Sequence, residues 1–116
     1  MNQPITKSSL PAPERRLVEL MQRLNFGRIE HLRVQAGTPV FDPPPRVVQK
    51  LKMGGDNGPR GEALLPDFWL KTQMAEMLAA LADLGDGEIL AIEVKNGLPF
   101  SLEIEQPQTP KGNVGA

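Results

Sequence analysis

Two segments of this chain repeat each other at an offset of 60 residues, and this constrains the fold more than any other feature of the sequence. Residues 27–40 align with residues 87–100 without a gap. The identical positions are Gly27, Ile29, Val34, Gly37 and Pro39, which recur as Gly87, Ile89, Val94, Gly97 and Pro99. Self-similarity at a fixed spacing indicates a duplicated structural unit. We therefore expect two similar units in one fold.

The stretch before each copy has the apolar spacing of an amphipathic helix. Residues 14–24 follow the i, i+3, i+4, i+7 pattern that buries one helix face. The positions are Leu17, Leu20, Met21 and Leu24. A longer helix is predicted over residues 66–84. Its apolar positions are Leu70, Met74, Met77, Leu78, Leu81 and Leu84.

Each copy then alternates like a strand, but the alternation shifts by one residue. Ile29 is out of phase with Leu32 and Val34, and the second copy has the same shift after Ile89. A one-residue shift predicts a β-bulge in each strand. An Ala-Gly or Asn-Gly pair follows the strand and favours a turn, because Gly and Asn tolerate positive φ. Each unit is therefore predicted to be a helix followed by two strands.

The strand that returns from the turn differs between the copies. In the second copy the apolar residues alternate cleanly, which predicts one buried face. These residues are Leu98, Phe100, Leu102 and Ile104. In the first copy three prolines at positions 43–45 must break the strand, because proline donates no ladder hydrogen bond. We predict that this strand resumes over residues 46–53, with Val47, Leu51 and Met53 on one face.

These patterns predict a single α+β domain. A chain of 116 residues has the usual length of one domain. Two αββ units, residues 14–53 and 66–105, are expected to form one antiparallel sheet with both helices packed on one face and the second helix better buried. Residues 54–65 are the expected linker. The polar ends, residues 1–13 and 106–116, are predicted to be flexible tails.

The net charge of −1 conceals two halves of opposite sign. Residues 1–60 hold ten Lys or Arg and five Asp or Glu, which gives +5, whereas residues 61–116 hold three and nine, which gives −6. Halves of opposite charge can attract each other, a second copy or separate partners. The alternative is that exposed charge drifted apart after duplication without any functional consequence.

The chain contains no cysteine and one histidine, His31. Without cysteine there is no disulfide, thiolate nucleophile or Cys-ligated metal, and one histidine falls short of the about three or four protein ligands of a zinc site. His31 is expected to pack at the surface or edge of the sheet. No carboxylate pair or catalytic triad has a recognisable spacing. We therefore expect no enzyme activity, no metal and no cofactor.

The apolar segments are all short. None reaches the roughly 18–20 residues that a membrane-spanning helix needs, and residues 1–13 lack the apolar centre of a signal peptide. The absence of cysteine also agrees with a reducing compartment. The expected location is cytoplasmic, without a membrane partner.

The loop GGDNGPRG at residues 54–61 has the glycines of a phosphate-binding loop, but no lysine followed by serine or threonine. It also lacks the closing glutamate of a calcium loop, because Asp67 stands at that position. We expect a flexible connector here, and a loop that contacts an anion or a partner is the alternative.

Basic residues in the first half are the candidates for anion or nucleic-acid contact. They are Arg28, Arg33, Arg46, Lys50, Lys52 and Arg60. Lys50 and Lys52 fall on one face of the predicted return strand, where they would attract phosphates. The chain has no Tyr, one Trp and four Phe for stacking on bases, and its pI is near 5.8. Exposed lysines that protect a sheet edge are the alternative interpretation.

Residues 17–53 resemble the YezD-like family of small bacterial proteins. The matching residues are Phe26-Gly27, Ile29, Val34, Gly37 and the run Val47-Val48-Gln49-Lys50. The resemblance implies a short helix, an aromatic-glycine junction, an alternating strand, a glycine turn and a basic return strand. The family has no assigned activity, so the resemblance adds no catalytic residues. The αββ plan is also similar to that of PepSY-type and inhibitor domains, at the level of the fold alone.

The sequence therefore favours a small non-catalytic cytoplasmic protein with a binding or regulatory role. Its expected partners are other proteins or its own copies, because the two halves carry opposite charge. Nucleic-acid binding by the basic first unit is the alternative. Such binding would use phosphate contacts and depend weakly on base sequence.

Overall fold

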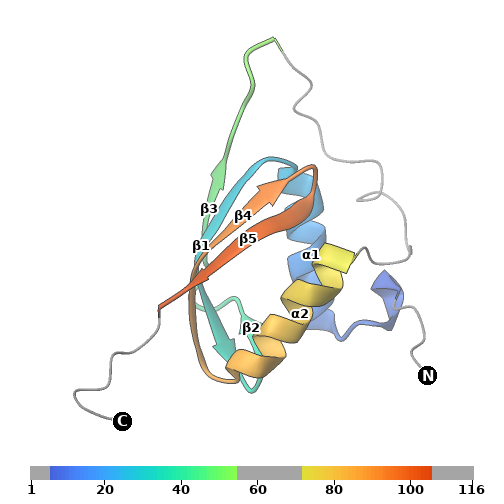
Figure 1. Ribbon diagram of the computed structural model, residues 1–116, viewed down its shortest axis with the longest axis vertical. Helices are drawn as coiled ribbons and strands as arrows, with labels where there is room; N and C mark the ends of the chain where they lie inside the picture. The colour runs from blue at the N-terminus through green and yellow to red at the C-terminus, as the bar shows by residue number, and fades with distance from the viewer. Residues whose placement is uncertain (1–5, 55–71, 106–116) are drawn as a thin grey trace.

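The computed structural model describes residues 6–54 and 72–105, which form two α-helices and one antiparallel sheet of five strands (Figure 1). In chain order the elements are the 3-10 turn η1 (Lys7–Ser9), α1 (Ala12–Leu24), β1 (Gly27–Gln35), β2 (Thr38–Val40), β3 (Arg46–Gln49), α2 (Thr72–Leu84), β4 (Gly87–Lys95) and β5 (Leu98–Ile104). Both helices lie on the same face of the sheet. The predicted α+β class and the single antiparallel sheet are confirmed.

The two repeated segments lie side by side at the centre of the sheet. The strand order is β2–β1–β4–β5, and β3 pairs with β1 along the same edge as β2. β1 and β4 run antiparallel, with Gly27 opposite Val94 and Val34 opposite Gly87. The strands that return from the turns, β2 and β3 on one side and β5 on the other, therefore form the edges.

A bulge near the middle of each central strand explains the shift in alternation. Ile29, Leu32 and Val34 are all buried in β1, and His31 between them has a positive φ of 59°. In β4 the pairing with β5 shifts between Ile89 and Ala91. A bulge turns the residues on either side of it to the same face. The bulge predicted in the second copy is thus confirmed, and the shift in alternation predicted in the first copy is confirmed by the burial of both Ile29 and Leu32.

Apolar side chains from both helices and both central strands form one core. Its members are Leu10, Leu17, Val18, Met21, Leu24, Ile29, Leu32, Val34, Met74, Met77, Leu81, Ile89, Ile92 and Val94. Full burial of a side chain of this kind contributes about 1.5–3 kcal/mol, which is what holds the helices to the sheet. α1 buries five residues and the described α2 three, so the expectation that the second helix is better buried is wrong for this part of it.

The first return strand is shorter than predicted. β3 ends at Gln49 rather than Met53, although the backbone N–H of Lys50 still donates to the carbonyl of Phe26 at 2.8 Å. The reason is that Gln49 pairs with Gly27, the first residue of β1. The chain beyond it lies opposite the end of α1, where no strand continues the ladder. Leu51 and Met53 are 55% and 86% exposed, so they do not share a buried face.

The second return strand departs from clean alternation at one residue. Leu98, Leu102 and Ile104 pack against the core, but Phe100 is 63% exposed. Pairing with β4 shifts between Val94, opposite Pro99, and Glu93, opposite Ser101, which leaves Phe100 without a partner in register. The prediction that Phe100 faces the core is therefore wrong, because a bulge cannot be placed from β5 alone.

The N-terminal boundary lies earlier than predicted. α1 begins at Ala12, and the preceding η1 buries Lys7 to 2% exposure, with its Nζ 3.1 Å from Glu19 Oε2. Leu10 joins the core. Residues 6–13 therefore belong to the domain rather than to a tail, because the ion pair of Lys7 with Glu19 and the burial of Leu10 in the core attach them to it.

Several predicted segments lie outside the described residues. These are residues 1–5 of the predicted N-terminal tail, the whole predicted C-terminal tail (106–116), the start of the second helix (66–71) and most of the linker with the glycine-rich loop (55–65). The predictions made for them stay predictions. No helix in the described part of the chain is long and apolar enough to cross a bilayer.

Candidate functional site

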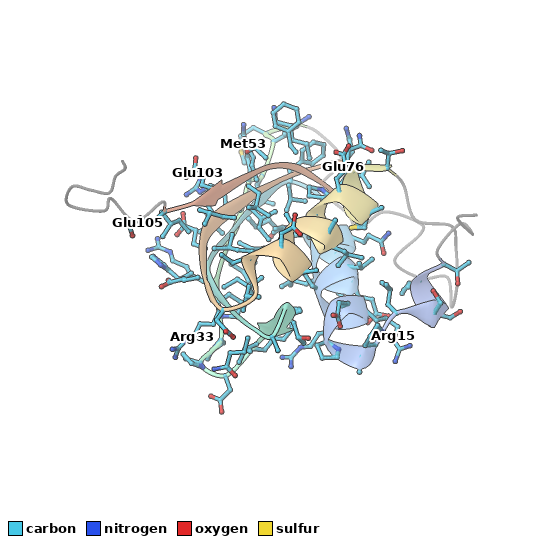
Figure 2. All side chains as sticks on the ribbon, turned by 60° about the horizontal axis from the view of Figure 1, so that its bottom comes forward. Arg15, Arg33, Met53, Glu76, Glu103 and Glu105 are labelled. Carbon is cyan, nitrogen blue, oxygen red and sulfur yellow. The ribbon has the colours of Figure 1, made fainter. Side chains whose placement is uncertain are left out.

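The face of the sheet turned away from α1 and α2, called the outer face below, has no helix over it within residues 6–54 and 72–105. Figure 2 shows Arg33, Glu103 and Glu105 on this side and Glu76 on the helix side. The alternation of the strands sends the apolar residues to the core and leaves charged residues outside. Among the described residues, the outer face is therefore a largely polar surface without a helix over it.

Charges on the outer face separate by strand. Strands β1 and β3 carry a basic half, defined by Arg28, Arg33 and Arg46. Strands β4 and β5, with the residue after them, carry an acidic half, defined by Glu88, Glu93, Glu103 and Glu105, and Lys95 at the end of β4 is the exception. The boundary runs between the two central strands, so the opposite charges of the sequence halves appear on one surface.

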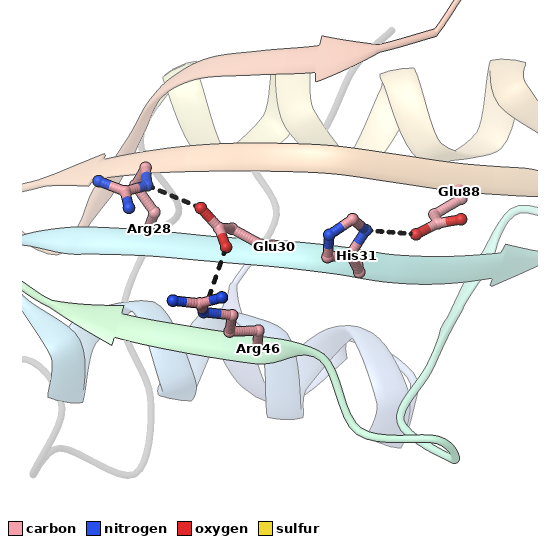
Figure 3. A network of polar contacts seen from close by, with 5 residues as sticks. All are labelled: Arg28, Glu30, His31, Arg46 and Glu88. Carbon is pink, nitrogen blue, oxygen red and sulfur yellow. Dashed lines mark hydrogen bonds and ion pairs between the residues drawn. The ribbon is translucent and has the colours of Figure 1, made fainter.

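Glu30 partly neutralises the basic half (Figure 3). The Arg28 Nε donates to Glu30 Oε2 at 2.9 Å, and the Arg46 Nε lies 3.5 Å from Glu30 Oε1. The hydrogen bond from Arg28, and then the positive charges of both arginines, hold the pKa of Glu30 below its usual range. Arg28 and Arg46, two of the residues predicted to contact an anion, therefore already have a carboxylate partner.

His31 joins the two halves at the bulge of β1. Its Nδ1 lies 2.7 Å from Glu88 Oε2 on β4, as Figure 3 shows, and its side chain is 64% exposed. Arg33 pairs in register with the same glutamate residue. His31 is thus a surface residue on the sheet, as expected, and it contributes to a polar contact between the central strands.

A hollow of about 550 Å³ opens where three chain segments meet, and we call it the basic hollow. Its walls come from the start of β1, the end of β3 with the residues after it, and the end of β4. The lining residues are Phe26, Gly27, Arg28, Val48, Gln49, Lys50, Lys52, Glu93, Val94 and Lys95. Four cationic side chains therefore surround it, with one carboxylate.

Aromatic rings hold two of these lysines. The Lys52 Nζ lies 4.2 Å from the centre of the Phe26 ring, and the Lys95 Nζ lies 3.9 Å from the centre of the Phe100 ring. An ammonium group over an aromatic face gains about 0.5–1 kcal/mol at an exposed site. The exposed Phe100 thus has a role on the surface, where it positions a cation beside the hollow.

The predicted basic residues do not form one continuous row. Arg28, Lys50 and Lys52 gather at the basic hollow, whereas Arg46 lies against Glu30. Arg33 lines a second hollow together with the acidic residues Asp86 and Glu88. Arg60 lies outside the described residues.

Lys95 is the member of the basic hollow that the sequence analysis missed. It ends β4, just before the turn at Asn96 and Gly97. The antiparallel pairing of β4 with β1 brings it beside Arg28. The sequence repeat predicted both central strands, but it did not predict that they pair with each other. No pattern in the sequence therefore placed Lys95 next to the basic residues of the first half.

Comparison of the chain with family models, curated proteins and solved structures gives no match. The resemblance to the YezD-like family therefore stays a prediction, and the functional argument rests on the surfaces described above.

Proposed function

We propose that this protein is a non-catalytic binding or regulatory module that associates with its own copies through the outer face of the sheet. One observation carries the proposal: a basic half on β1 and β3 lies next to an acidic half on β4 and β5. Complementary charge steers association and selects orientation. Such a surface is complementary to itself, and a symmetric pair of identical chains meets through the same surface on both.

The direction of the two-fold axis follows from the strand order. An axis parallel to the strands places β3 of one copy over β5 of the other, so each basic half covers an acidic half. An axis across the strands places like charges over each other, which costs energy. The charge pattern therefore supports one face-to-face arrangement and disfavours the other.

Two half-buried residues provide an apolar centre for this arrangement. Leu90 and Ala91 lie in β4 at its bulge, and neither belongs to the core cluster or to the apolar residues packed against it. Association surfaces commonly have an apolar centre with a charged rim. Some rim charge is compensated within the chain, since Arg28 lies opposite Glu93, so we expect weak, salt-sensitive binding.

Sedimentation velocity at low and high salt tests the proposal. The Debye length shortens from about 30 Å at 0.01 M salt to about 3 Å at 1 M, so dimers should form at low salt and dissociate at high salt. The double variant Glu103→Lys, Glu105→Lys should stay monomeric in both. The control Glu76→Lys, Asp83→Lys makes the same charge change at exposed positions of α2 and should dimerise like the parent protein. A parent protein that is monomeric at low salt would contradict the proposal.

Nucleic-acid binding is the second candidate function, and the gathering of Arg28, Lys50 and Lys52 at one hollow favours it. Each lost phosphate contact should lower the slope of log affinity against log salt by roughly 0.7–0.9. A gel-shift titration of the variant Lys50→Glu, Lys52→Glu, with duplex and single-stranded probes, measures this. Equal binding by parent and variant would remove this candidate.

A further inference from the structure

We propose that the basic hollow is a binding site for a compact multivalent oxyanion, such as a diphosphate or triphosphate group. Arg28, Lys50, Lys52 and Lys95 line it, and Glu93 is the only acidic lining residue among those that the structure describes. The formal charge of the lining is therefore +3. A compact multivalent anion is attracted by several of these cations at once, with Arg28 also in contact with Glu30, which gives it an advantage over a singly charged ion.

The framework of the hollow is fixed by the backbone. The Lys50 N–H donates to the Phe26 carbonyl at 2.8 Å, which holds the end of β3 against the start of β1. Gly27 permits this close approach, because a Cβ at that position would overlap the carbonyl oxygen of Val48. The cations therefore project from a braced corner of the sheet, and less ordering is needed when an anion binds.

The side chains that approach the anion are also restrained. Phe26 and Phe100 hold the ammonium groups of Lys52 and Lys95 near the hollow. A phosphate oxygen accepts hydrogen bonds from an ammonium group more strongly than a ring attracts it. Lys95 can therefore turn from its ring to the anion.

The surroundings favour a compact anion over a nucleic-acid strand. Along the outer face from the hollow, Arg46 is held by Glu30, and the next residues of β1 lie beside Glu88. Carboxylates of the acidic half flank the other side. A strand with regularly spaced phosphates would run from the hollow onto these carboxylates, whereas a diphosphate or triphosphate fits at the hollow alone. The hollow shares Arg28 and Glu93 with the proposed self-association face, whereas Lys50, Lys52 and Lys95 belong to the hollow alone.

Isothermal titration of the full chain with sodium tripolyphosphate tests the inference, with sulfate and a short oligothymidylate as comparison ligands. We expect one tripolyphosphate per chain, bound more tightly than either comparison ligand and more weakly as salt is raised. Lys50→Gln and Lys95→Gln should each lower the affinity about fivefold, the upper end for one exposed charge contact. Arg33→Gln removes the same charge at the far end of β1 and should leave the affinity unchanged.

Three results would overturn the inference. They are the absence of tripolyphosphate binding at millimolar concentration, an equal loss of affinity in Arg33→Gln, and tighter binding of the oligothymidylate. The last result would assign the hollow to nucleic acid instead. Thermal melts by circular dichroism check that each variant is folded. Sedimentation of the variant Glu103→Lys, Glu105→Lys tests self-association separately. Failure of anion binding and failure of self-association can therefore be told apart.

Discussion

Replacing Gly27 by alanine tests how closely β3 must approach β1. Gly27 has a φ of +154°, which side chains rarely adopt, and a Cβ there would overlap the carbonyl oxygen of Val48. Gly87 stands at the matching position of the second copy with a φ of +159°. Its Cβ would come no closer than 3.2 Å to the end of the Leu84 side chain. Alanine at either position would thus have the same backbone strain, but only alanine at position 27 would clash with the backbone of β3.

The difference sets the expected magnitudes. Strain in a sparsely populated backbone region costs roughly 1–3 kcal/mol, and both variants incur it. In Gly27→Ala the chain of β3 must also move. This weakens the pairing of β1 with β3, which extends from the pair Gly27–Gln49 to the pair Glu30–Arg46. Loss of one or two backbone hydrogen bonds adds about 2 kcal/mol, for a total of about 3–5 kcal/mol.

Urea unfolding followed by circular dichroism gives the free energy of unfolding of each variant. We expect Gly27→Ala to lose clearly more than Gly87→Ala, and the end of β3 to lose its protection from hydrogen exchange only in the former. Equal losses, or a larger loss in Gly87→Ala, would refute the reasoning, because the contact with the β3 backbone would then have no effect.

Three further predictions concern burial and charge. Because the pKa of Glu30 is lowered in the folded protein, its contribution to stability is full above the pKa of the unfolded chain and is lost as the pH falls through the pKa of the folded protein. In thermal melts at a series of acidic pH values, Glu30→Gln should reduce this dependence of stability on pH. Leu32→Ala, at a fully buried position, should cost about 2–5 kcal/mol in urea unfolding, whereas Met53→Ala, at an exposed one, should stay within about 0.5 kcal/mol. Lys7→Met should destabilise less than Lys7→Ala in the same assay, because methionine keeps most of the buried volume, and the reverse order would contradict this.

The features predicted correctly depend on local patterns. The helical spacing around Leu17 and Met21 placed one buried face. The shift in apolar alternation between Ile29 and Leu32 predicted the irregularity in β1, because a bulge changes the alternation of the strand that contains it. Repetition of the pattern in the second copy supported both interpretations.

The features missed depend on contacts between segments far apart in the sequence. Phe100 faces outward because the register with β4 shifts beside it, and β5 alone alternates cleanly. Lys7 is buried because Glu19 on α1 lies within reach. Lys95 reaches the basic hollow because β4 pairs with β1. The five predicted basic residues that the structure describes therefore separate into groups once strand pairing and carboxylate neighbours are known.

Mixing two oppositely altered variants tests self-association through the outer face most directly. Glu103→Lys, Glu105→Lys takes the formal charge of the four residues that define the acidic half from −4 to 0, and Arg33→Glu, Arg46→Glu takes the three residues that define the basic half from +3 to −1. Each variant alone should be monomeric at low salt, because the attraction between its two halves is lost in the first variant and replaced by repulsion in the second. Sedimentation of the equimolar mixture should show a one-to-one heterodimer that dissociates at high salt. A mixture that stays monomeric, or a dimer formed by either variant alone, would contradict association through this face.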